Sequence, residues 1–110
     1  MLGVRLYMAQ RLSALVMAPL VAGHLAVMIY AVQGGLTAAE ILGRTQGSLA
    51  WAIFYGLFAV AVSVHASIGL RVVLSETLKL HGRALDGVSW AIFLGLLALG
   101  ARAVWAVTVP

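Results

Sequence analysis

The chain contains 110 residues, of which 64% are hydrophobic and 9% are charged, and its mean hydropathy is +1.09. A soluble domain carries about 25% charged residues, so this composition excludes one and predicts an all-α integral membrane protein, with residues 1–110 forming a single domain. The chain has no cysteine and its seven Lys and Arg are scattered, which excludes disulfides, thiolate metal sites and a basic face for nucleic acid.

The first membrane-spanning helix is predicted from about residue 10 to residue 32, after a short interfacial lead-in. The apolar run that follows Arg11 is long enough to cross a hydrocarbon core, which takes about 20 residues. Pro19 lies inside this run and is expected to kink the helix. Ser13 and His24 share one helix face, because a step of 11 residues returns close to the same direction. His24 is therefore predicted to be buried.

The first connection begins at Gln33-Gly34-Gly35, which ends the helix. Thr37 and Glu40 then follow the Thr-x-x-Glu capping-box pattern, so a short interfacial helix is expected up to about Arg44. We expect this connection to be structural.

The second spanning helix is predicted from about residue 48 to residue 76, longer than a membrane requires, so it should tilt or protrude. It contains His65, and an ionisable side chain at membrane depth usually serves a metal, a proton path or a structural hydrogen bond. Ala61 and Gly69 lie one turn before and after His65 on the same face. Either a flat cofactor or a neighbouring helix would fit against these small residues.

The most polar stretch, residues 71–86, is predicted to be a loop at the membrane surface, with His81 solvated. The third spanning helix is predicted from about residue 88 to residue 109. Arg102 on this helix is expected to snorkel outward or to form an ion pair with an acidic group in the bundle. Small residues on the same face are expected to pack against the bundle; they are Ala91, Gly95 and Ala98.

The basic residues predict how the chain crosses the membrane. Only Arg44 and Arg102 fall on one side, and the other five fall on the opposite side: Arg5, Arg11, Arg71, Lys79 and Arg83. By the positive-inside rule, we expect the N-terminus in the cytoplasm and the C-terminus outside, in a multi-pass protein of the cell inner membrane.

Two segments together resemble a known family, the three-helix, cytochrome b-type membrane-anchor subunits of succinate dehydrogenase and fumarate reductase. Residues 10–14, Gln-Arg-Leu-Ser-Ala, are similar to the Arg-x-Ser/Thr-Gly/Ala pattern with which these anchors enter the membrane. The run His65-x-x-x-Gly69-x-Arg71, with Glu76 eleven residues after the histidine, is similar to the family's haem motif on the second helix. The number of spans, the chain length and the expected orientation agree with the family along nearly the whole chain.

The resemblance implies that His65 is an axial ligand to the iron of haem b, with Arg71 and Glu76 near a haem propionate or the quinone. Helix I of related five-helix anchors carries a histidine for a second haem, so His24 is a second candidate ligand. Measured from the centres of the apolar runs, His24 lies about 3 Å outward and His65 about 6 Å inward of the membrane midplane. We therefore expect the second ligand of the His65 haem from a partner anchor subunit, leaving His24 to bind another haem or to hydrogen-bond structurally.

The resemblance also implies that Arg11 and Ser13 donate hydrogen bonds to a quinone carbonyl, although Arg11 would equally serve as an interfacial anchor. The chain departs from the family at three positions, one of which is Glu76, where the family has Asp. Val72 stands where one branch has a second histidine, and Thr77 stands where another branch has a tyrosine. A quinone-binding tyrosine would therefore have to come from a partner chain.

The resemblance thus implies the membrane-anchor, cytochrome b subunit of a succinate:quinone oxidoreductase that acts in electron transport. It would be non-catalytic on its own, and it would tether a flavoprotein subunit and an iron–sulfur subunit, with a second membrane-anchor subunit completing the bundle. One alternative is a haem-free, quinone-binding anchor of the same complex type. Another is a small structural membrane protein, or one whose histidines relay protons.

Overall fold

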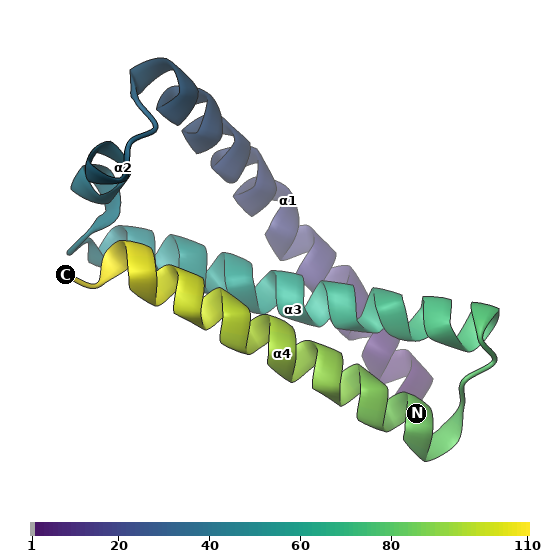
Figure 1. Ribbon diagram of the computed structural model, residues 1–110. Coiled ribbons are helices and arrows are strands. Elements are labelled where there is room, and N and C mark those ends of the chain that lie inside the picture. Colours follow the sequence, from purple (N-terminus) through teal and green to yellow (C-terminus); the bar gives the residue numbers. More distant parts are fainter. Residues whose placement is uncertain (1) are drawn as a thin grey trace.

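The computed structural model describes residues 2–110, and its helices are labelled in Figure 1. Three of them are long: α1 (Leu2–Gly34), α3 (Leu49–Thr77) and α4 (Gly82–Thr108). The short helix α2 (Ala38–Thr45) connects α1 to α3. Each long helix has the length and apolar composition of a membrane span, and no strand occurs between residues 2 and 110. The prediction of an all-α protein with three spans is confirmed.

Two helices begin earlier than the hydropathy pattern predicts. Helix α1 begins at Leu2 rather than near residue 10, and α4 begins at Gly82 rather than near residue 88. Of the loop predicted over residues 71–86, only residues 78–81 are non-helical, so that prediction is wrong in its extent. The stretch before residue 10 is helical, and its interfacial position stays a prediction. The hydropathy of a segment marks where the membrane ends, whereas the helix continues because it still satisfies its own backbone hydrogen bonds.

Helix α3 lies at the centre of the bundle and packs against both α1 and α4 (Figure 1). Helices α3 and α4 run antiparallel side by side, while the C-terminal turns of α1 lean away from them toward α2. The N-terminus lies at the end of the bundle where α3 turns into α4, and the C-terminus lies at the opposite end near α2. The molecule is 47 Å long, which exceeds the roughly 30 Å of a hydrocarbon core.

The short helix α2 ties the first connection to the end of α4. Thr37 caps α2 as predicted, because its side chain accepts a hydrogen bond from the backbone N–H of Glu40 at 3.2 Å. At the other end of α2, the hydroxyl of Thr45 donates to the carbonyl oxygen of Val107 at 2.6 Å. The backbone N–H of Gly47 donates to the carbonyl oxygen of Thr108 at 2.7 Å. These bonds hold the C-terminus of α4 beside α2.

Helices α3 and α4 approach each other closely at Gly100. A Cβ atom added there would lie 2.8 Å from the Cβ of Ala59, which belongs to a short, rigid side chain. The small residues predicted to pack against the bundle, Ala91, Gly95 and Ala98, are exposed within this chain. Their packing in the complete bundle stays a prediction.

We expect Gly100→Ala to loosen the α3–α4 pair, because the added methyl group forces the two backbones apart. Overpacking of this kind costs about 1–3 kcal/mol, and it should lower the temperature at which the purified protein loses helical circular dichroism. Gly95→Ala is the matched control, since nothing lies within 4 Å of a Cβ added there. Equal effects of the two substitutions would contradict this description of the contact.

Candidate functional site

His65 lies where α3 crosses α1, and it contacts the other helix through one ring nitrogen. The Nδ1 atom of His65 is 3.4 Å from the hydroxyl oxygen of Ser13, which is itself only 7% exposed. Ser13 is held in turn by its own helix, since its hydroxyl donates to the carbonyl oxygen of Gln10 at 3.0 Å. The second nitrogen of the ring, Nε2, has no hydrogen-bond partner among residues 2–110. His65 is thus a fixed imidazole with one nitrogen left to bind a ligand.

The small residues around His65 are used in the packing of helices. Ala61 is 5% exposed. A Cβ added at Gly69 would lie 3.6 Å from the side-chain nitrogen of Gln10. On the Gly69 side, therefore, the neighbour is helix α1, one of the two possibilities that the sequence left open.

His24 lies on the same face of α1 as Ser13, as predicted, but it meets α3 at a different level. Its ring packs edge-on against the rings of Tyr55 and Phe58, at centroid distances of 6.1 Å and 5.2 Å. Because these residues precede His65 by ten and seven positions, the two histidines meet α3 about 10–15 Å apart along its axis. This separation argues against one iron bound by both residues.

The surroundings of His24 are mostly apolar. Its Nδ1 atom is buried and has no hydrogen-bond partner in the described part of the chain. The ring borders a cavity of ≈ 450 Å³ that also touches α2 and α4. No group of three His, Cys, Asp or Glu residues able to hold a metal occurs within residues 2–110.

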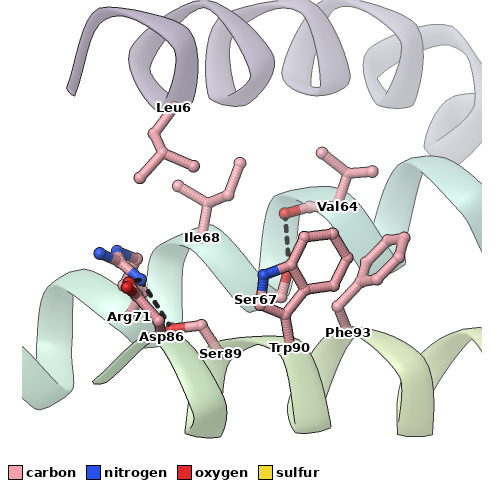
Figure 2. A pocket seen from close by; sticks show the side chains of 9 residues that line it. All are labelled: Leu6, Val64, Ser67, Ile68, Arg71, Asp86, Ser89, Trp90 and Phe93. Carbon is pink, nitrogen blue, oxygen red and sulfur yellow. Dashed lines mark hydrogen bonds and ion pairs between the residues drawn. The ribbon is translucent and has the colours of Figure 1, made fainter. Parts of the chain in front are cut away.

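Arg71 lies on the other side of α3 and faces α4 (Figure 2). Its Nη1 atom forms an ion pair with Oδ1 of Asp86 at 2.7 Å and donates to the hydroxyl of Ser89 at 3.4 Å. The Arg71 side chain is 18% exposed and that of Asp86 is 50% exposed. A guanidinium group has five N–H donors, so these two contacts leave several donors free.

Beside this ion pair is a cavity of ≈ 370 Å³ between α1, α3 and α4. Figure 2 shows Arg71, Asp86 and Ser89 together at one end of the cavity and aromatic side chains of α4 at the other. The remaining wall is largely aliphatic and comes from α1 and α3; it includes Leu6, Val64 and Ile68. A cavity of about 300–1,000 Å³ with apolar walls and a few grouped polar side chains is typical of a small-molecule site.

The structure does not bring together all the residues that are predicted from the sequence to form the haem and quinone sites. Arg11 is exposed, and its guanidinium lies over the ring of Tyr7 at 5.9 Å. Ser13 is two positions away and therefore points to another side of α1, so the two residues do not converge within this chain. Glu76 is exposed and does not line the cavity beside Arg71. His81 is exposed, with its Nδ1 atom 3.0 Å from the carbonyl oxygen of Lys79.

Sequence reasoning missed three residues of the Arg71 cavity: Asp86, Ser89 and Trp90. The sequence predicts Asp86 in a loop, but α4 begins at Gly82, and spacings of three and four residues place Asp86, Ser89 and Trp90 on one face of this helix. The available signal was the charge on Asp86, since an acid so close to a membrane span needs a cationic partner.

Comparison with known proteins identifies one family. The model of the succinate dehydrogenase/fumarate reductase transmembrane subunit matches residues 1–103. No curated protein and no solved structure matches the chain.

Proposed function

The chain belongs to the succinate dehydrogenase/fumarate reductase transmembrane subunit family, and we propose that it is the haem-bearing membrane anchor of a succinate:quinone oxidoreductase. It tethers a flavoprotein subunit and an iron–sulfur subunit to the cell inner membrane. Catalysis of succinate oxidation belongs to those subunits, whose cofactors perform the redox chemistry.

The observation that carries the haem proposal is the cross-helix contact between His65 and Ser13. Metal-ligating histidines almost always engage their second ring nitrogen with a hydrogen-bonding group. His65 has this arrangement, with Nδ1 against the Ser13 hydroxyl at 3.4 Å and Nε2 without a partner in the described chain. When bound, haem would supply a one-electron carrier within the membrane. The residues of this chain would hold the ligating ring in place through the contact between His65 and Ser13.

His65 would hold the haem from this chain, and a further ligand would have to come from another residue. His24 meets α3 about 10–15 Å from His65, as described above. The exposed apolar surface of the helices leaves room for a second anchor subunit, and we infer that this partner provides the other ligand. His24 would then have a structural role or serve a separate haem.

The cavity beside Arg71 supports a quinone site. Its volume is ≈ 370 Å³ and its walls are mostly apolar, which suits a flat quinone ring. The free N–H groups of Arg71 would donate to a quinone carbonyl, while Asp86 and Ser89 hold the guanidinium. A haem propionate would be recognised by the same donors. Arg11 is exposed at the surface of α1 and would contact the quinone only through a site shared with a partner subunit.

The proposed orientation follows the distribution of basic residues. With the N-terminus and the turn between α3 and α4 in the cytoplasm, Arg71 lies toward the side where the iron–sulfur subunit docks. Electrons then leave the soluble subunits close to the quinone cavity.

Deletion of the gene for this chain tests the anchoring function. Without the anchor, the flavoprotein and iron–sulfur subunits should move from the membrane to the soluble fraction. Succinate oxidation measured with a soluble dye should persist there, while quinone reduction should be lost. If both subunits stay on the membrane and still reduce quinone, the chain is not their anchor, and a structural or proton-relay role becomes the better account.

A further inference from the structure

We propose that Ser13 is a positioning residue for His65: its hydroxyl accepts the N–H of Nδ1 and so keeps Nε2 free for the haem iron. This inference rests on the proposed haem ligation by His65. It differs from the role in quinone binding that the family resemblance implies for Ser13.

The assignment follows from counting hydrogens. The Ser13 hydroxyl has a single hydrogen, and that hydrogen is donated to the carbonyl oxygen of Gln10 at 3.0 Å. Toward His65 the oxygen can therefore offer only a lone pair. At 3.4 Å from this oxygen, Nδ1 must carry the proton for a hydrogen bond to form. The neutral ring then has its lone pair on Nε2, the nitrogen that has no partner in the described chain.

The position of Ser13 favours this role over contact with quinone. The residue is 7% exposed, and it does not line the cavity beside Arg71. Both of its hydroxyl contacts are within the protein, so a quinone carbonyl has neither a free donor nor an open path at this oxygen.

The bond from Ser13 to Gln10 also fixes the geometry before any haem is bound. A serine hydroxyl bonded to the backbone of the preceding turn is restricted to few rotamers. The acceptor oxygen is thus placed by α1, and the ring that it orients belongs to α3. A change in the distance between these helices would change the orientation of the ligating ring.

The bond has a predictable electronic effect. A hydrogen bond donated by Nδ1 makes the imidazole a stronger electron donor through Nε2, and a stronger donor stabilises ferric over ferrous iron. Loss of the acceptor should therefore raise the midpoint potential of the haem, and it should also free the ring to rotate about its bond to the backbone.

The experiment compares Ser13→Ala with Ser13→Thr in the purified complex containing all subunits. Threonine keeps the hydroxyl, whereas alanine removes it. Ser63→Ala is the control. Like Ser13, Ser63 is buried, but it lies on α3, two positions from His65. Its hydroxyl donates to the carbonyl oxygen of Ala59 in its own helix. The readouts are the haem content, the midpoint potential from a redox titration of the b-type absorbance, and the electron paramagnetic resonance spectrum of the ferric haem.

We expect Ser13→Ala to shift the potential upward and to alter the ferric spectrum, with Ser13→Thr and Ser63→Ala resembling the wild type. If Ser13→Ala does not assemble, Ser13→Cys should give the same shift, because a thiol is a weaker acceptor of similar shape. A Ser13→Ala complex with bound haem and an unchanged potential and spectrum would overturn the inference. If that complex also had a raised KM for quinone, Ser13 would instead be assigned a role in quinone binding. Absence of b-type haem from an intact wild-type complex would instead overturn the haem proposal itself.

Discussion

Replacement of His65 by alanine should abolish the b-type absorbance of the complex while the subunits still assemble. The ring supplies the nitrogen ligand that α3 places at its contact with Ser13 of α1, and alanine has no group that can bind iron. Assembly should survive, because α3 keeps its remaining contacts with α1 and α4. A dithionite-reduced minus oxidised spectrum of the purified variant measures the effect.

The other two histidines serve as controls for this substitution. His24→Ala should retain the absorbance of the His65 haem, since His24 packs against Tyr55 and Phe58 at another level of α3. His81→Ala should also retain it, because His81 is exposed in the turn before α4. Loss of the absorbance in an assembled His24→Ala complex would show that the separation along α3 does not keep these residues from one haem, or that a second haem is present.

Replacement of Arg71 by alanine should lower quinone reduction with succinate by about 10- to 150-fold. A hydrogen bond to a charged group contributes about 1.5–3 kcal/mol, and each 1.4 kcal/mol of transition-state stabilisation is a factor of ten in rate. Succinate oxidation with a soluble dye should be unchanged, because that reaction does not use the membrane cavity. The ratio of the two activities in purified complex is the measurement.

Two further substitutions test whether quinone turnover depends on the Arg71 guanidinium itself or on the residues that hold it. Asp86→Asn removes the ion pair but leaves Ser89 in contact with Arg71, so it should reduce quinone turnover by less than about tenfold. Arg83→Ala removes an exposed basic residue outside the cavity and should have little effect. Equal losses in Arg71→Ala and Arg83→Ala would indicate a general effect of positive charge rather than a quinone contact.

The spans were predictable from the sequence, whereas the ends of the helices were not. Hydropathy identifies the segments that lie in the membrane, and it predicted both ends of α3 to within about one residue. Helices α1 and α4 begin at Leu2 and Gly82, before the predicted spans, in stretches that contain Arg5, Arg83 and Asp86. The prediction of a loop up to Asp86 failed for this reason, and the pairing of Asp86 with Arg71 was missed with it.

The site was predictable only in part, because a helical repeat gives the face of a residue but not its level against a neighbour. Periodicity placed Ser13 and His24 on the face of α1 that meets α3. The crossing of the two helices decides that Ser13, rather than His24, lies beside His65. The same limitation explains the α3–α4 contact, where small residues occur on several faces of α4 and, among its glycines, Gly100 is the one whose added Cβ would meet Ala59.

The most direct test of the account is to purify this chain, carrying an affinity tag, from detergent-solubilised membranes and to record the difference spectrum of what is eluted. The account predicts that a flavoprotein and an iron–sulfur protein co-elute with the chain and that the eluate shows a b-type spectrum. An intact, quinone-reactive complex without a b-type spectrum would contradict the haem and leave a haem-free anchor. Elution of the chain without a flavoprotein would contradict the anchor itself.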